Sequence, residues 1–546
     1  MTKTSTSSNQ RVLFRGGEVH SPADPFATSM LVDGDSIAWV GSDEAADMFG
    51  DVRVVDLDGA LVTPGFVDAH AHVTETGLSL EGLSLDDATS VQQVLDRVAE
   101  AARATSDATV VTGTGWDESR WSDPRPPTAQ ELDRASGNRK VFLARVDVHS
   151  AAVSGTLIAE AGLSSLAGFD ESGLVTKDAH DRARRAARAL TPSRRAEVQR
   201  AALEHAASRG VVALHEMSAP GISGNDDLAV LIRLCESAQD LPEVMFYSGQ
   251  LVGSVEEAQA LRATLPGLRG LAGDLCADGS IGSGTAAFRA PYLGGATPAA
   301  PYLSAEQVSK HVQGSTQAGL QAGFHVIGDA ALDVVLDGFE RATAALGTAA
   351  VGSAGHRLEH VVTADDDQIA RLVRLGLLVS VQPAFDAAWG GDSGMYADRV
   401  GAQRSARMNR IGSMIGSGVP LALGSDCPVT PLDPWGSIRA AVFHSSPAER
   451  ISARAAFTAH TRGGWRAAGE HGKGVIAPGQ PASFAVWAAG DLIVQAADDR
   501  LASWSTDPRS GTPGLPDLSD PHFRPRCLLT VRDGVTLFAD NSFGAP

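Results

Sequence analysis

Cysteine is scarce in this 546-residue chain, which has only four and no CxxC pair. The four lie far apart, so we expect free thiols and neither a disulfide framework nor a thiolate zinc cluster. Long apolar runs are missing too, because no stretch of about 18 apolar residues predicts a membrane span. The polar start MTKTSTSSNQ lacks the apolar core of a secretory signal, and this predicts a cytoplasmic protein.

Positive charge is in short supply as well. The chain has 45 lysines and arginines against 65 aspartates and glutamates, a formal net charge of −20. Phosphate backbones and anionic membranes repel such a chain, so no nucleic acid and no membrane is expected as a partner. A small molecule is the expected partner, and a homo-oligomer is compatible with the sequence. Only five of the basic residues are lysines, so a lysine within a motif stands out.

Both ends of the chain show short alternating strands and Asp-Gly turns. SMLVDGDSIAWVG near the start and CLLTVRDGVTLFAD near the end share this pattern. Alternation with such turns predicts small antiparallel sheets. We expect residues 1–62 and 466–546 to combine into one β-sandwich that flanks a central domain of residues 63–465.

Between the two ends, eight apolar strand-like runs alternate with Ala-rich helical stretches. The runs begin near Leu61, Val211, Glu243, Leu271, Gly323, Gly355, Leu375 and Val419. Eight repeated βα units predict an α/β fold, a TIM (β/α)8 barrel. The interval of about residues 73–207 after the first strand is too long for an ordinary βα connection, so it predicts an inserted subdomain.

Metal-competent side chains lie at the C-terminal ends of these predicted strands, where barrel active sites are built. The first strand ends in an HxH pair, His70 and His72, and later strands end at His325, His360 and Asp426. Alternate residues of a strand share a face, so His70 and His72 point the same way and can bind one cation. An HxH pair alone is weak evidence, but the ordered series HVIGD, RLEH and GSDCP strengthens it.

These motifs resemble the amidohydrolase superfamily, whose pattern is HxH on strand one, single histidines on strands five and six, and an aspartate on strand eight. More narrowly, GWDESRW, VDVHS, DGSIGSGTA, HVIGDAA, RLEH, SVQP, GSDCPV and WSTDPRSGTP are similar to the branch that contains N-substituted formamide deformylases. The resemblance spans nearly the whole chain, and its motifs are specific in combination.

The resemblance implies two divalent ions, usually zinc, with His70, His72 and Asp426 on one and His325 and His360 on the other. It implies a hydrolase that cleaves a C–N bond, of amide or N-formyl type, in a small molecule through a metal-bridging hydroxide. Two ions that share a water lower its pKa and polarise a carbonyl group. Asp426 would accept the proton and return it to the leaving amine.

The bridging ligand departs from the family pattern. The branch usually carries Glu in a GVLxE-like motif of the insertion and Lys on strand four, whereas this chain has GLVTK, ending in Lys177, and GDLCADGS, with Asp274. One hypothesis is that Lys177, carboxylated by CO2, bridges the two ions, a role closed to arginine because its guanidinium stays charged. A second is that Asp274 bridges and Lys177 pairs with it. A third is that Lys177 is a solvated loop residue.

Four further residues are candidates beside the ligands. VDVHS, which the resemblance places by the barrel mouth, offers His149 to the substrate, His215 ends the second strand, and Trp116 lies in a loop able to line an aromatic pocket. Asp329 is expected to orient His325 or Asp426, because ligand side chains usually need a supporting partner.

Three alternative functions stay open. Hydrolysis of an ester or lactone would use nearly the same site. A deaminase on this barrel typically has a glutamate three residues beyond the strand-five histidine, where this chain has Gly328, so deamination is the disfavoured alternative. A noncatalytic scaffold would have lost metal ligands, and here all five remain.

Overall fold

An eight-stranded parallel barrel forms the centre of the computed structural model, which describes residues 11–106, 110–218, 221–295, 297–493 and 513–544. Its strands follow chain order: β7 (Phe66–Ala71), β13 (Val211–Ser218), β14 (Glu243–Ser248), β15 (Leu268–Leu271), β16 (Gln321–Val326), β17 (Arg357–His360), β18 (Leu378–Val381) and β19 (Leu421–Leu423). Hydrogen bonds from His72 N to Cys427 O (3.0 Å) and from Asp426 N to His70 O (2.8 Å) join the last strand to the first. The predicted TIM barrel is confirmed.

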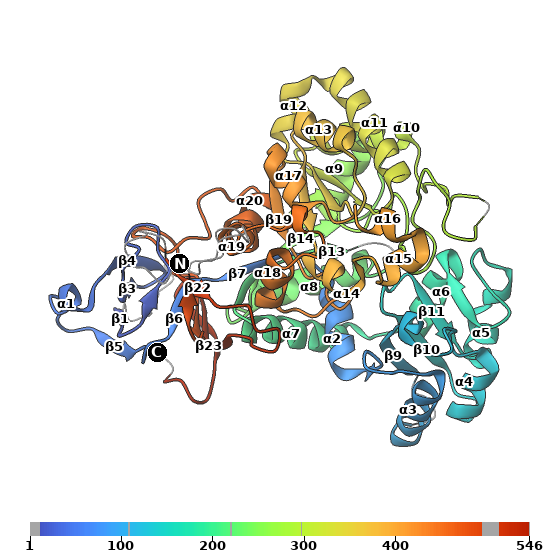
Figure 1. Ribbon diagram of the computed structural model, residues 1–546, viewed down its shortest axis with the longest axis horizontal. Helices are drawn as coiled ribbons and strands as arrows, with labels where there is room; N and C mark the ends of the chain where they lie inside the picture. Colours follow the sequence, from blue (N-terminus) through green and yellow to red (C-terminus); the bar gives the residue numbers. More distant parts are fainter. Residues whose placement is uncertain (1–10, 107–109, 219–220, 296, 494–512, 545–546) are drawn as a thin grey trace, which may run out of the picture.

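Helices cover the outside of the barrel (Figure 1). The longer ones are α7 (Pro192–Ser208), α8 (Asn225–Ser237), α9 (Val255–Thr264), α10 (Ala305–Gln317), α11 (Asp329–Leu346), α13 (Asp366–Leu375) and α18 (Pro434–Val442). Local sequence explains where several begin: Ser304 with Gln307 and Asp365 with Gln368 form capping boxes that satisfy the first backbone N–H groups of α10 and α13. Their buried faces join the strands in one apolar core. No helix in the described residues has both the length and the apolar character to cross a membrane.

Two further sheets lie beside the barrel, at the left of Figure 1. One joins β4 (Ser36–Gly41), β3 (Ser29–Asp33), β1 (Val12–Arg15) and β5 (Arg53–Asp56), and the other joins β2 (Glu18–Val19), β6 (Leu61–Pro64), β20 (Phe484–Ala488), β23 (Arg526–Arg532) and β24 (Val535–Ala539). Apolar side chains from both ends of the chain pack between them. The sheets are mixed, because β1–β5 and β2–β6 pair in parallel. Asp533 and Gly534 both have positive φ and form the tight β23–β24 turn.

The first predicted strand divides in two at Gly65. Residues Leu61–Pro64 pair with β20 in the sandwich, whereas Phe66–Ala71 pair with β13 in the barrel. Glycine is required at the crossing because a Cβ atom there would meet the Val212 side chain at 2.2 Å. The fourth strand was also placed too late, since β15 ends at Leu271 and the positive φ of Gly273 turns the chain away.

The inserted segment forms its own five-stranded sheet, at the lower right of Figure 1. Its strands are β8 (Leu83–Ser84), β9 (Val111–Trp116), β10 (Val141–Arg145), β11 (Ser150–Val153) and β12 (Leu174–Thr176), with helices α3 (Val91–Ala104), α4 (Ala129–Ser136), α5 (Gly155–Ala161) and α6 (Lys177–Ala187). Alternate residues of β10 enter two cores: Val141 and Leu143 face one, and Phe142 and Ala144 the other. Both faces of the sheet are therefore covered, and α6 borders the barrel mouth.

Candidate metal centre

Four buried histidines converge at the C-terminal mouth of the barrel. His70 lies near the end of β7, and His72 directly precedes helix α2 (Val73–Glu81). His325 lies on β16, and His360 is the last residue of β17. Ring centroids are 4.7 Å apart for His70 and His360 and 4.6 Å for His325 and His360. Three segments far apart in sequence thus supply one cluster of four imidazoles.

Two carboxylates complete this cluster. Asp426 Oδ1 lies 3.1 Å from His72 Nε2 and 3.4 Å from His70 Nε2. Asp274 lies nearer the middle: its Oδ1 is 3.4 Å from His70 Nε2, 3.6 Å from His325 Nδ1 and 3.9 Å from His360 Nε2, and its Oδ2 is 3.2 Å from His72 Nε2. Asp274 is therefore the one carboxylate of this described cluster within 4 Å of all four imidazoles.

The electrostatics of the centre favour ionised carboxylates. Burial alone would raise the pKa of Asp274, but the His70 and His72 imidazoles hold that pKa well below its ordinary value. Burial likewise opposes ionisation of Asp426, but the same two histidines hold its pKa below the ordinary value. Two anionic ligands are thus available to a cation.

The donor set fits divalent metal ions. Among the described residues, five atoms in the cluster are buried without a hydrogen-bond partner: His70 Nε2, Asp274 Oδ1, His325 Nδ1, His360 Nε2 and Asp426 Oδ1. Buried polar atoms normally have partners, so five that converge need another explanation, and a bound cation is one. Three overlapping groups of ligand atoms lie within 4.8 Å: His70–His72–Asp274, His70–His360–Asp426 and Asp274–His325–His360. Imidazole and carboxylate ligands suit zinc and other transition ions.

Left-handed backbone brings two of these ligands into place. His360 has φ +70° and Asp426 has φ +55°, values that non-glycine residues rarely adopt. By strand alternation, Glu359 and His360 would face opposite sides of β17, yet both side chains contact the centre. The backbone turn at His360 explains this, and strain of this kind is typical of functional sites.

Two supporting residues were missed in the sequence. His70 Nδ1 donates to Glu359 Oε2 (2.9 Å), and Arg357 Nε donates to Glu359 Oε1 (2.6 Å). His360 Nδ1 donates to Gln382 Oε1 (2.7 Å), in the motif SVQP. These contacts fix the tautomer in which each Nε2 is free to bind a metal. The alternation of RLEH offered a signal, because Arg357 and Glu359 share a strand face inside the barrel.

The Glu359→Gln variant should bind metal about 10- to 100-fold more weakly, because an amide holds His70 without the negative charge that balances Arg357. Titration of the metal-free protein against a competing chelator measures this affinity. Glu340→Gln is the matched control and should bind metal as the wild type does. Glu340 is exposed on α11 and pairs with Arg371 of α13. Equal affinity in all three proteins, with thermal unfolding confirming that each is folded, would remove the role given to Glu359.

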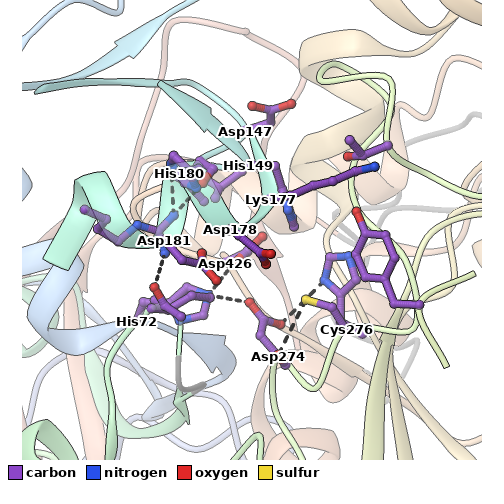
Figure 2. A pocket seen from close by; sticks show the side chains of 18 residues that line it. His72, Asp147, His149, Lys177, Asp178, His180, Asp181, Asp274, Cys276 and Asp426 are labelled. Carbon is purple, nitrogen blue, oxygen red and sulfur yellow. Dashed lines mark hydrogen bonds and ion pairs between the residues drawn. The ribbon is translucent and has the colours of Figure 1, made fainter. Parts of the chain in front are cut away.

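Lys177 occupies a different position from that of a buried bridging ligand. It is exposed, has φ +50°, begins α6 and lines the cavity above the histidines (Figure 2). Within the described residues, no hydrogen bond or ion pair joins Lys177 to the four histidines or to Asp274. The structure therefore brings Asp274, and not Lys177, into the cluster.

Three other predicted residues have structural partners instead. Trp116 is 1% exposed because helices α3 and α4 cover its side of the inserted sheet. Its indole N–H donates to Leu143 O (2.9 Å). His215 is fully buried, and its Nδ1 accepts from Arg357 Nη1 (2.8 Å). Asp329 accepts from Arg289 N (2.8 Å) and lies outside the cluster, since its helix α11 starts beyond the mouth.

A cavity of about 430 Å³ opens over the centre (Figure 2). His149 lines it, with its ring centroid 5.2 Å from that of His325. Cys276 and His180 line it too, and no motif in the sequence singled them out. Burial lowers the pKa of His149 to about 4, aided by His325. The ring is therefore neutral at pH 7. A narrower apolar compartment of about 40 Å³ adjoins the cavity and is lined in part by Phe385, Trp389, Met395 and Tyr396.

The barrel and its histidine–aspartate cluster define a metal-dependent hydrolase. The chain belongs to the amidohydrolase family, whose family model matches residues 53–538. It is 27% identical over 510 residues to Protein LONG AFTER FAR-RED 3 of Arabidopsis thaliana, covering 85% of this chain and 84% of the relative. It is 25% identical to the N-substituted formamide deformylase of Arthrobacter pascens over 463 residues, 78% of this chain and 82% of that protein. An uncharacterized metal-dependent hydrolase from Pyrococcus furiosus superposes with a TM-score of 0.68 at 26% identity, covering 87% of this chain and 98% of that one.

One quoted motif, WSTDPRSGTP, lies outside the described residues except for its final proline.

Proposed function

We propose that this protein is a binuclear hydrolase that cleaves the C–N bond of an amide or N-formyl group in a small molecule. The observation that carries the proposal is the convergence of five unpartnered buried ligand atoms on one point beneath an open cavity. Similarity to an N-substituted formamide deformylase favours this bond type. Two ions, most plainly zinc, fit the imidazole and carboxylate donors.

Asp274 is the proposed bridge between the two ions. His70, His72 and Asp426 would hold one ion, and His325 and His360 the other. A pair of nearby cations needs an anion between them, and the Asp274 carboxylate lies within 3.2–3.9 Å of all four imidazoles. A carboxylated Lys177 would have to reach this point from an exposed position, so we assign the bridge to Asp274.

The protein's own side chains then divide the work of hydrolysis. When bound, the two ions supply a nucleophile at neutral pH and polarise the carbonyl group. Asp426 lines the cavity, where its carboxylate takes the proton of the attacking water and delivers it to the leaving nitrogen. Neutral His149 donates a hydrogen bond to the substrate, and the compartment beside Phe385 receives an apolar substituent.

Deamination is disfavoured by a specific steric observation. At Gly328, where a deaminase would carry its glutamate, a Cβ atom would meet Ala287 O at 2.0 Å. The backbone here therefore has no room for a side chain. Ester or lactone hydrolysis uses the same centre and remains the alternative that the test must separate.

The test compares N-formyl derivatives of simple amines with the corresponding formate esters. The zinc-loaded protein should release formate from at least one N-formyl amine, and the chelator-treated protein should not. Turnover of esters alone would replace the amide assignment by an esterase. A folded, metal-loaded protein inactive on both series would support a noncatalytic scaffold.

A further inference from the structure

A second cavity, of about 590 Å³, lies beside the substrate cavity and is rich in arginine. Its cationic wall consists of Arg184 and Arg185 on α6, Arg188 directly after α6, and Arg195 on α7. We call it the arginine cleft. Arg184 and Ile222 line both cavities, so the cleft adjoins the substrate cavity at these two residues.

Half of these arginines already have carboxylate partners. Arg188 pairs with Glu75, and Arg195 pairs with Asp227. Within the described residues, no carboxylate forms an ion pair with Arg184, and no hydrogen bond or ion pair involves Arg185. Asp181, which lines the substrate cavity, acts on both arginines through space. In a chain with net charge −20, two arginines on one wall that lack an ion pair with a carboxylate in the described residues are unexpected.

Arg184 is the more telling of the two because it is only 5% exposed. Its Nη1 donates to Gly221 O (3.0 Å) and its Nη2 to Val148 O (2.6 Å). The carbonyl groups satisfy its hydrogen bonds but bring no full negative charge, and burial lowers its pKa, although Asp181 opposes this through space. A buried charge held this way is stabilised further by an anion.

Two local negative features do not fully offset this charge. The C-terminal end of α6 contributes about half an elementary charge, less than the charge of the two arginines that lack an ion pair. Asp226 also lines the cleft, in the first turn of α8. Among the residues that line the cleft, four arginines face three carboxylates, Glu75, Asp226 and Asp227, whereas Asp181 lines the substrate cavity on the other side of Arg184.

We propose that the arginine cleft binds a carboxylate or phosphate group. Planar guanidinium groups recognise both through paired hydrogen bonds. The anion has two sources: the distal end of a substrate that reaches past Arg184, or a separate small anion. Binding itself needs no turnover, so this inference does not depend on the proposed hydrolase activity.

The binding test is calorimetric titration of the metal-loaded protein with inorganic phosphate. Arg185→Ala should weaken phosphate binding about ten-fold or more, the loss of one charge-assisted contact. Arg182→Ala, an exposed arginine of α6 outside the cleft, is the matched control and should leave binding unchanged. Two results would overturn the proposal. One is equal affinity of the wild type and Arg185→Ala for phosphate, which is also what binding at the metal centre alone would give. The other is no binding of phosphate by the wild type.

A kinetic comparison separates the two sources of the anion. If the anion belongs to the substrate, Arg185→Ala raises KM for an N-formyl amino acid but not for the matched N-formyl amine without its carboxylate. If it is a separate molecule, both KM values stay unchanged while phosphate binding weakens. Either result supports the cleft as an anion site.

Discussion

Replacement of Asp274 by asparagine is expected to empty much of the metal centre and to lower kcat/KM by about 10²-fold or more, a loss of about 3 kcal/mol in transition-state stabilisation. The change keeps the size of the side chain and removes the one carboxylate, among the residues described, that lies within 4 Å of all four imidazoles. Metal content by inductively coupled plasma mass spectrometry and hydrolysis of the best N-formyl substrate measure the two effects.

Lys177→Ala is the decisive comparison for that variant. If Asp274 is the bridge, Lys177→Ala keeps two ions per chain and most of its activity, because Lys177 is exposed and, in the described residues, forms no hydrogen bond or ion pair with the cluster. The carboxylated-lysine hypothesis predicts the reverse. Lys177→Ala would then be inactive and regain activity with short carboxylic acids, whereas Asp274→Asn would stay active.

Asp426→Asn should reduce kcat by about 10²- to 10⁴-fold, the range expected when a general acid and base is lost. Asparagine keeps an oxygen toward His72 but cannot take up a proton. The pH profile should change as well. The lowered pKa of Asp426 keeps its carboxylate ionised at neutral pH, so the wild type should lose activity only as the pH falls far enough to protonate Asp426. In the variant, that acidic limb should disappear from the residual rate.

Asp398→Asn, an exposed carboxylate on helix α15 (Met395–Val400), is the matched control and should behave as the wild type does. An Asp426→Asn protein that retains full activity at saturating metal would show that another group carries the proton.

Sequence alone located the histidines because parallel strands of a barrel end at one mouth. HxH on the first strand and single histidines on the fifth and sixth needed no knowledge of packing. Asp274 was harder to place, because β15 ends at Leu271 and the left-handed turn at Gly273 decides where the carboxylate points.

Other residues depended on contacts between distant segments. Glu359 was overlooked because its role is to accept a hydrogen bond from His70, which lies 289 positions away in the sequence. Trp116 was assigned to the substrate because a loop was expected there, whereas the inserted sheet buries it beneath α3 and α4. Arg184 gave no signal in the sequence, since its missing carboxylate partner is a property of the folded cleft.

The most direct test is anomalous diffraction from a crystal of the zinc-loaded protein at the zinc absorption edge. Two peaks at the barrel mouth, one beside His72 and Asp426 and one beside His325 and His360, with unmodified Asp274 between them, are the predicted result. A single peak at full occupancy in an active protein, or density for a carboxylated Lys177 between two peaks, would contradict the account.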